Sequence, residues 1–317
     1  MSRPVILDTD LGSDVDDALC LSLALASPEL EIVGITCVGR ESRRRAQITR
    51  RLLELAGREE IPVYAGCSVP IVGVGALNWF GHEGGGVLEP GEEPEFEALH
   101  AVDALETLSR RHADLEVVAV GPMTNLAVTL AKDPGLVGRI RRLTIMGGHL
   151  RRVEYGGHRF APGIDYNLCS DPHASYAVLR SGIPTRLVTA DVTLRTCIRD
   201  ADVLELERTG HPYLVAVARA VRLWTPVMNR LFGAIGCDTS ADNASFLHDP
   251  LTYACAYDES FCSFADLEIE TRIEDGVLRT LERPGPSDES FPMRCAVEVD
   301  AEAFRDHFME RVLSLAR

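Results

Sequence analysis

Several features that point to particular classes of protein are missing from this chain of 317 residues. No apolar run approaches the length of a membrane span, which argues against a membrane protein. There is no internal repeat and no low-complexity linker, so a solenoid or a string of domains is not expected. The opening Met-Ser-Arg-Pro leads directly into an apolar run and leaves no room for a signal peptide. We therefore expect a cytoplasmic protein.

Cysteine is present, but not in the arrangement of a disulfide framework or a zinc site. The chain has nine cysteines, an odd number, and they are widely spaced with no Cys-x-x-Cys pair. Most of them lie in apolar stretches. We expect reduced core residues, as is usual for a cytosolic protein.

Positive charge is scarce. The chain has 32 lysines and arginines against 48 acidic residues, which gives a net charge of −16 at pH 7. Such a balance disfavours nucleic acid and anionic membranes as partners. The hydrophobic content of 46% is normal for a soluble globular protein, and the length allows a large core.

Apolar strand-like runs alternate with helical patterns through the first 190 residues. Repeated strand–helix units of this length predict an α/β fold with an open, mostly parallel, Rossmann-like sheet and helices on both faces. In the helix predicted at 43–56, Ile48, Leu52 and Leu53 form the apolar side and the arginines lie outside. The expected strands are 4–7, 31–38, 62–65, 115–120, 143–146 and 185–190, and the other expected helices are 18–25, 101–112, 123–132 and 171–181.

Two segments lack a regular pattern. Residues 71–97 are rich in glycine and predict an ordered surface loop, whose length favours a functional role. Residues 149–163 form a second irregular segment with few apolar residues. Residues 211–232 predict a helix or helix pair, interrupted near Pro226.

The C-terminal part of the chain predicts an extension of strands and one helix. Strand patterns occupy 264–299 around a turn at Asp275-Gly276, and a last helix is expected at 301–316. Because no linker separates these elements from the rest, we expect a single domain over residues 1–317.

Five aspartates crowd together near the start of the chain, at positions 8, 10, 14, 16 and 17. They separate the first strand from the first helix, and ligands of open α/β sheets bind at such strand ends. Carboxylates this close repel one another and need a neutralising group. Because all the candidate ligand atoms are oxygens, we expect Ca²⁺ or Mg²⁺ rather than zinc or copper. Helix capping explains Asp16 and Asp17 but not the other three.

Polar segments also follow later strands, at 121–125, 146–148, 165–172 and 248–250. Taken singly, the glycine-containing segments at 121–125 and 146–148 are most simply turns. Asp171 and Asp249 each precede a proline at the start of a helical pattern and are most simply helix caps. Spacing alone does not show that these segments meet in space.

Together, these segments resemble the inosine–uridine-preferring nucleoside hydrolase family over nearly the whole chain. The run from Asp8 to Leu19 is similar to the family's DxDPGxDD signature, with two residues inserted before the paired acids. Residues 62–66 and 81–84 add support. Four further motifs follow in the family's order: Gly121-Pro122-Met123-Thr124-Asn125-Leu126-Ala127, Ile145-Met146-Gly147-Gly148, Asp165-Tyr166-Asn167 with Asp171-Pro172, and His248-Asp249-Pro250.

The resemblance implies an open α/β fold and hydrolysis of the N-glycosidic bond of ribonucleosides to ribose and free base. It also implies one Ca²⁺, bound by the carboxylates of Asp10, Asp17 and Asp249 and by the main-chain carbonyl of Thr124. The ribose 2′- and 3′-hydroxyls and one water would complete the coordination. The partner is therefore a small ribonucleoside, and the family's dimers and tetramers predict a homodimer or homotetramer.

By the same resemblance, Asp16 is the general base for the attacking water, and His248 protonates the departing base or holds it where it can accept a proton. Asp165 and Asn167 bind the 5′ and 3′ side of the ribose, and His82 lines the pocket. Departure of the base leaves an oxocarbenium-like cation, which clustered carboxylates stabilise. Attack opposite the leaving base predicts inversion at C1′.

The chain departs from the family pattern at several positions. The two inserted residues leave a choice of base between Asp14 and Asp16, and we place it at Asp16 because the acidic pair there runs straight into the helix. Asp165 replaces the family's usual Glu. Arg40 stands where the family usually has Asn, and a later ribose-binding Asn is missing. Arg40 or Arg159 is therefore a candidate for contact with a sugar or a phosphate.

Other functions compete with this interpretation. Asp8-x-Asp10 after a strand also matches the nucleophile motif of aspartyl phosphotransferases, in which Asp8 attacks phosphate with help from Mg²⁺. An EF-hand loop is excluded, because Ser13 and Leu19 stand where it needs Gly and Glu. A non-catalytic ribose-binding protein would keep the fold and the metal. Four aromatic residues either stack on a base or pack in the core: Trp79, Phe80, Trp224 and Phe232.

Overall fold

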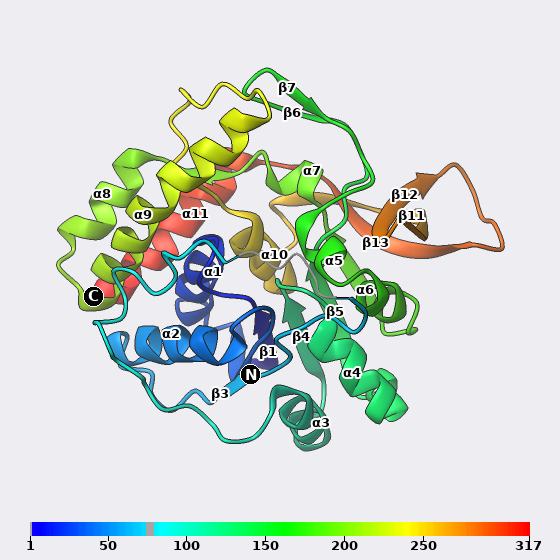
Figure 1. The fold of residues 1–317 in the computed structure, drawn as a ribbon, viewed down its shortest axis with the longest axis horizontal. Coiled ribbons are helices and arrows are strands. Elements are labelled where there is room, and N and C mark those ends of the chain that lie inside the picture. The colour runs from blue at the N-terminus through cyan, green and yellow to red at the C-terminus, as the bar shows by residue number, and fades with distance from the viewer. Residues whose placement is uncertain (1, 74–78) are drawn as a thin grey trace.

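The alternation of strands and helices predicted from the sequence is confirmed in the computed structural model, which describes residues 2–73 and 79–317. One nine-stranded sheet has the order β12-β11-β13-β8-β5-β4-β1-β2-β3 (Figure 1). All its pairings are parallel except those of β11 with β12 and β13. Its strands are β1 (Arg3–Thr9), β2 (Leu30–Cys37), β3 (Val63–Ala65), β4 (Leu115–Ala119), β5 (Ile140–Met146), β8 (Thr185–Val188), β11 (Cys262–Glu274), β12 (Val277–Arg283) and β13 (Ser290–Val299).

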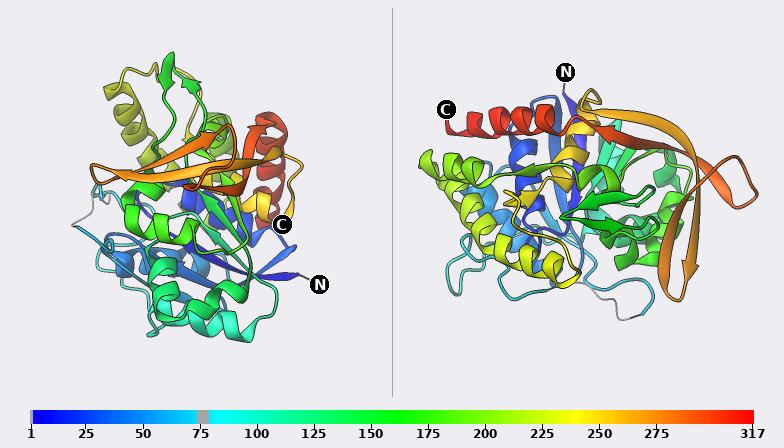
Figure 2. Two further views of the ribbon diagram at one scale, coloured as in Figure 1. Left: turned by 90° about the vertical axis from the view of Figure 1, so that its right-hand side faces the viewer. Right: turned by 90° about the horizontal axis from the view of Figure 1, so that it is seen from above.

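Helices cover both faces of this sheet, because alternate side chains of its strands enter two different cores. In β1, Val5 and Leu7 belong to one core and Ile6 to the other. Figure 2 shows the helical layers from two further directions. The first core receives α1 (Asp16–Leu25), α2 (Ser42–Leu55), α8 (Asp200–Arg208), α9 (Pro212–Ala234), α10 (His248–Tyr257) and α11 (Ala301–Leu313), and the second receives α3 (Ala101–Arg111), α4 (Thr124–Lys132) and α6 (Pro172–Leu179).

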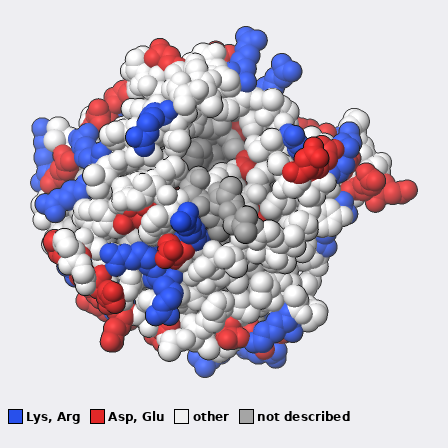
Figure 3. All heavy atoms as spheres, in the orientation of Figure 1, with Lys and Arg blue, Asp and Glu red and all other residues white. Residues whose placement is uncertain are grey.

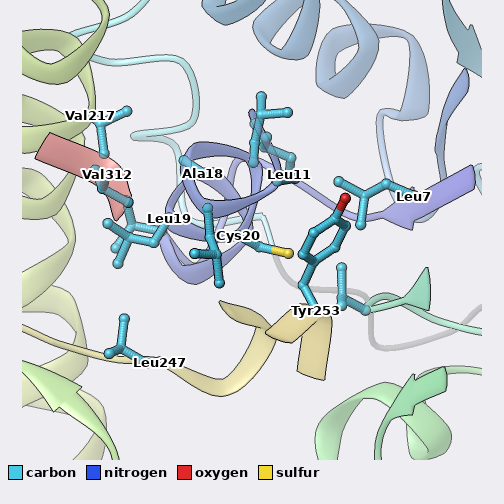
Figure 4. Close-up of a cluster of buried hydrophobic side chains, with 14 of the residues drawn as sticks. Leu7, Leu11, Ala18, Leu19, Cys20, Val217, Leu247, Tyr253 and Val312 are labelled. Carbon is cyan, nitrogen blue, oxygen red and sulfur yellow. The ribbon is translucent and has the colours of Figure 1, made fainter. Parts of the chain in front are cut away.

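Helix α1 lies inside the first core and is buried on all sides. Its Leu19 and Cys20 are fully buried between Val217 of α9, Tyr253 of α10 and Val312 of α11 (Figure 4). Burial of a large apolar side chain stabilises a fold by about 1.5–3 kcal/mol. The start of α1 is therefore held in a fixed position relative to α10.

The order in which strands are added to the sheet reverses between β1 and β4, although the two strands are parallel. Strands β2 and β3 extend the sheet on one side of β1, whereas β4, β5 and β8 extend it on the other. A crevice forms at such a reversal, along the edge made by the carboxyl ends of the parallel strands. We refer to this edge as the carboxyl edge.

Two predictions about local structure are wrong. Residues 149–163 are not irregular throughout, because β6 (Val153–Tyr155) and β7 (His158–Phe160) form a short hairpin. Helix α9 is continuous through Pro226. Its buried side chains Val221 and Met228 lie on either side of the proline in one core, and this packing compensates for the missing hydrogen bond.

The predicted C-terminal extension is confirmed. Strands β11 and β12 meet at Asp275-Gly276, where both residues have positive φ, as in a type I′ turn. Because β13 pairs with β8, these strands belong to the central sheet, although the division of the chain into domains stays a prediction. The loop at 71–97 includes positions outside the described residues, and its described parts contain no helix.

All nine cysteines are free thiols, and five of them are buried. Burial raises the pKa of Cys37 and Cys295 to about 12, so these two thiols stay protonated. Along residues 2–73 and 79–317, no helix combines the length and the apolar character that a membrane span requires.

Candidate active site

A cavity of about 390 Å³ lies at the carboxyl edge, where the surface in Figure 3 is hollowed near its centre. Residues following β1, β4 and β5 contribute to its lining, together with the first turns of α1 and α10. Six aspartates line its polar side: Asp10, Asp14, Asp16, Asp17, Asp165 and Asp249. Acids that are far apart in the sequence therefore share one cavity.

Three of these acids form the tightest group. Carboxylate oxygens of Asp16, Asp17 and Asp249 all lie within 4.8 Å of one another. Asp16 and Asp17 occupy the first turn of α1, and Asp249 occupies the first turn of α10. The packing of α1 against α10 brings them together, and Asp10 at the end of β1 lies beside them in the same cavity.

The electrostatics of this group call for a cation. Burial, followed by repulsion from neighbouring carboxylates, raises the pKa of both Asp16 and Asp249. Burial also raises the pKa of Asp10 and Asp17, although the Arg45 guanidinium opposes the rise in both. Among the described residues, no salt bridge reaches Asp16, Asp17 or Asp249. Oxygen atoms left in this state are suited to a divalent ion such as Ca²⁺ or Mg²⁺.

A buried arginine holds the loop that carries Asp10. Arg45 donates hydrogen bonds to the carbonyl oxygens of Asp10 and Arg40, the latter at 2.8 Å, and to Ser13 Oγ at 3.1 Å. Only 1% of Arg45 is exposed, so the prediction that the arginines of this helix lie outside is wrong at this position. Its fixed donors and charge replace the water that this loop would otherwise need.

Close backbone contact also fixes Asp10. A Cβ atom added to Gly121 would lie 2.9 Å from both the backbone nitrogen and Oδ1 of Asp10. Only glycine therefore fits after β4, where the two halves of the sheet separate. The hydroxyl of Thr9, the last residue of β1, donates to the carboxylate of Asp17 and holds it in place.

Asp14 and Asp8 make different contacts from the central group. The Oδ1 atom of Asp14 accepts from the backbone nitrogens of Val15 at 2.7 Å and Asp16 at 3.4 Å, so this carboxylate stabilises the start of α1. Burial raises the pKa of Asp14 to about 7. Asp8 is fully buried and does not line the cavity. Its Oδ1 accepts from Thr36 at 2.5 Å and from Asn125 at 2.8 Å.

The residues predicted to bind ribose, Asp165 and Asn167, are held by hydrogen bonds at the start of a short helix. Asp165 caps α5 (Tyr166–Ser170) by accepting from the backbone nitrogen of Leu168 at 3.0 Å. Asn167 Nδ2 donates to the carbonyl oxygens of Val120 at 2.7 Å and Met146 at 3.2 Å, which ties α5 to the ends of β4 and β5. Both side chains line the cavity.

His248 lines the cavity beside Asp249 and is half-buried. Its Nδ1 lies 2.6 Å from the hydroxyl of Thr193, and its ring centroid is 5.1 Å from that of Phe246. Burial lowers the pKa of His248 to about 4. The imidazole is therefore neutral at pH 7.

Four other candidates are not in the lining of this cavity. Thr124 is buried at the start of α4, and its hydroxyl donates to Asp171 Oδ2 at 2.8 Å. His82 Nε2 donates to the carbonyl oxygen of Ser13 at 2.8 Å, so it holds the loop between β1 and α1. Arg40 and Arg159 are exposed.

Five aromatic side chains also line the cavity, and we refer to them as the aromatic wall: Phe80, Phe160, Trp224, Phe232 and Phe246. Phe80, Trp224 and Phe232 were candidates from the sequence, whereas Trp79 lies against the Arg45 guanidinium instead. Phe160 from the β6–β7 hairpin and Phe246 before α10 were missed. No local pattern marks them, because their position depends on how distant segments pack. Phe232 joins them, with ring centroids 6.1 Å from Phe160 and 5.2 Å from Phe246.

Comparison with known proteins identifies relatives along nearly the whole chain. A family model described as inosine-uridine preferring nucleoside hydrolase matches residues 5–306. The pyrimidine-specific ribonucleoside hydrolase RihA of Photobacterium profundum is 32% identical, and the match covers 98% of this chain and 99% of that protein. RihA of Klebsiella pneumoniae is 32% identical over 263 residues, covering 80% and 79%. The solved structure of a purine-preferring ribonucleoside hydrolase from Gardnerella vaginalis matches with a TM-score of 0.82 and 27% identity, covering 99% of each chain.

Proposed function

Because this chain belongs to the inosine–uridine-preferring nucleoside hydrolase family, we propose that its carboxylate cluster binds one Ca²⁺ and a ribonucleoside at the carboxyl edge. The chain is a nucleoside N-ribohydrolase, an enzyme that hydrolyses the N-glycosidic bond of ribonucleosides. The main support for locating the reaction here is the group of Asp16, Asp17 and Asp249 oxygens within 4.8 Å, in the cavity that Asp10 shares.

The donor set fits a hard dication. We assign the carboxylates of Asp10, Asp17 and Asp249 and the carbonyl oxygen of Thr124 as ligands, and oxygen-only coordination favours Ca²⁺. Thr124 is the least supported of the four, since it is not in the lining of the cavity. When bound, Ca²⁺ supplies positive charge that orients the ribose hydroxyls and makes a neighbouring water more acidic.

The protein side chains have separate roles in the reaction. Asp16 acts as the general base for the attacking water. Asp165 and Asn167 hold the ribose. Asn167 Nδ2 already donates to main-chain carbonyls, so Asn167 would bind a ribose hydroxyl through its Oδ1 atom. His248 assists the departing base, either as a proton donor or through a hydrogen bond. The buried carboxylates stabilise the positive charge that develops on the ribosyl group.

One observation favours a second assignment at the metal. Asp16 belongs to the tight oxygen group, whereas Asp10 does not. In this alternative, Asp16 is a ligand and Asp10 is the base. Metal analysis of Asp16→Asn separates the two, because a base variant keeps its calcium and loses turnover, whereas a ligand variant loses both.

The phosphotransferase alternative has little support from the geometry. Asp8 would be the nucleophile, but its carboxylate is fully buried, bonded to Thr36 and Asn125, and absent from the cavity. A nucleophile must reach its substrate. Activity on a generic phosphate ester that Asp8→Asn abolishes would reverse this conclusion.

The proposal is tested by assaying ribose release from a panel of purine and pyrimidine ribonucleosides, with and without a chelator. The panel needs both classes, because the relatives are named as pyrimidine-specific and purine-preferring. We expect release from at least one nucleoside, and we expect Asp17→Ala to lower calcium content and turnover together. Wild-type calcium content in Asp17→Ala would contradict the ligand assignment. A silent panel would contradict the simple substrate assignment. Dimer or tetramer formation stays a prediction from the family.

A further inference from the structure

The ring of His248 is held from behind by one hydroxyl group. Its Nδ1 lies 2.6 Å from Thr193 Oγ1, and Phe246 packs against its face with ring centroids 5.1 Å apart. Thr193 is fully buried at the end of α7 (Ala190–Thr193), the short helix that follows β8. The contact is therefore shielded from water.

The segments that carry the two residues are tied together independently of this contact. The backbone nitrogen of Leu247 donates to the carbonyl oxygen of Thr196 at 3.0 Å, and the Thr196 hydroxyl donates to the carbonyl oxygen of Thr193 at 2.8 Å. Within α7, the backbone nitrogen of Thr193 donates to the carbonyl of Thr189 at 3.0 Å. The position of Thr193 relative to His248 is thus fixed by main-chain bonds.

The distances indicate which atom carries the proton. A threonine hydroxyl has a single donor. Its other acceptor here, the carbonyl oxygen of Ala190, is 3.5 Å away, whereas His248 Nδ1 is 2.6 Å away. If Nδ1 carried a proton, the Thr193 hydroxyl would be left with only the Ala190 carbonyl as an acceptor, so the contact geometry favours Nδ1 as the acceptor and, in the neutral ring, a proton on Nε2. Among the described residues Nε2 has no hydrogen-bond partner, and His248 lines the cavity.

We propose that Thr193 is a positioning residue, which fixes His248 in the tautomer that presents Nε2–H to the departing base. This inference rests on the proposed function and defines how that site treats its leaving group. As the bond between C1′ and the base breaks, its electron pair moves onto the base. A hydrogen bond from Nε2–H to an acceptor on the base stabilises that charge, and no proton has to leave the ring.

The tautomer can be measured without any reaction. We expect ¹⁵N NMR of histidine side chains in the metal-free protein to show His248 protonated on Nε2 and unprotonated on Nδ1. Thr193→Val removes the hydroxyl at nearly constant shape and should leave a mixture of tautomers, whereas Thr193→Ser should restore the single form. A wild-type signal with the proton on Nδ1 would overturn the proposal.

Kinetics then separate positioning from a merely structural role. For nucleosides, we expect Thr193→Val to lower kcat on the order of a hundred-fold with little change in KM. A p-nitrophenyl riboside, whose leaving group needs no hydrogen bond, should be cleaved within about threefold of the wild-type rate. Thr193→Ser should retain most activity on both substrates. Thr209→Val is the control for loss of a threonine hydroxyl, since Thr209 follows α8 and its hydroxyl contacts only the backbone of Leu206 and His211 among the described residues, away from the cavity lining.

Each outcome of the kinetic test has one meaning. Equal slowing of both substrates by Thr193→Val, or unchanged turnover of both, would overturn the positioning role. Wild-type protein that cleaves no nucleoside would refute the proposed function, while the NMR result still decides the tautomer.

Discussion

Buried carboxylates are stabilised in two different ways in two regions of this molecule. Away from the cavity, two buried carboxylates, Asp202 and Glu270, are paired with arginine. Asp202 in α8 accepts from Arg305 of α11 at 2.7 and 2.8 Å, and Glu270 in β11 lies between Arg272 and Arg283. The hydrogen bond from Arg283 keeps the pKa of Glu270 low.

At the carboxyl edge the opposite holds. Asp16 and Asp249 are just as buried, yet burial and their neighbours raise the pKa of both. The nearby Arg45 donates to the backbone oxygens of Asp10 and Arg40 and to the Ser13 hydroxyl. Asp202 and Glu270 are thus neutralised by arginines within the fold. The cavity acids Asp16 and Asp249 have no such partner among the described residues, which supports the proposal that a metal ion binds there.

The largest expected effect on calcium binding and turnover comes from replacing one buried aspartate of the cavity, compared with one buried aspartate elsewhere. Asp249→Asn should abolish calcium binding and lower kcat/KM by roughly a thousand-fold or more, since a charged ligand is lost. Asp202→Asn should leave calcium content and turnover per folded molecule unchanged, but lower the free energy of unfolding by about 3 kcal/mol, because Arg305 loses its partner. Metal analysis and urea unfolding of both variants would show the contrast, and calcium retained by Asp249→Asn would contradict it.

A smaller effect is expected from removing the metal. In metal-free protein, burial raises the pKa of Asp8 from 3.8 to about 7. A carboxyl group with a raised pKa in the folded state favours folding fully below its unfolded pKa, and this contribution disappears as the pH rises through about 7. Chelated protein should therefore lose stability between pH 4 and 7, by at most on the order of 4 kcal/mol for this group. Calcium beside Asp10 should weaken this dependence only in part, because it offsets the repulsion from Asp10 but not the burial that is the main cause of the shift. Thermal unfolding at several pH values would reveal the difference, and identical curves with and without chelator would argue against a metal near Asp10.

The smallest effect concerns the aromatic wall. Phe232→Ala removes a ring that contacts Phe160 and Phe246 at the cavity. Stacking on a base is worth about 1–3 kcal/mol, so KM should rise about tenfold with little change in kcat. Phe291→Ala is a matched control, because this ring lies in β13 and does not line the cavity. An equal change in KM for both variants would show that the ring supports the fold rather than the substrate.

The sequence predicted those parts of the fold and site that depend on local pattern. The strand–helix alternation predicted the parallel sheet, and the aspartate cluster at the end of β1 predicted the cavity, since both follow from periodicity and chain order. Four of the other candidates, Asp165, Asn167, His248 and Asp249, also line the cavity. Their catalytic and binding roles stay predictions.

What the sequence did not predict depends on contacts between distant segments. Arg45 is buried in an amphipathic helix whose other arginines are exposed or half-buried, and only the position of the Asp10 loop explains its burial. Phe160 lies in a hairpin whose strands have three residues each, too short for a clear pattern. Thr193 is an isolated threonine without any motif, and its relation to His248 appears only when α7 meets the start of α10.

The tight contact between Gly121 and Asp10 has a consequence for how this enzyme evolves. A single added methyl group at position 121 would lie 2.9 Å from the backbone nitrogen and Oδ1 of Asp10 and from Cγ1 of Val38, neither of which belongs to the two hydrophobic cores. One nucleotide change in the gene is enough to replace glycine by alanine. A duplicated copy thus has a short route to a stable descendant that keeps the architecture and gives up the chemistry.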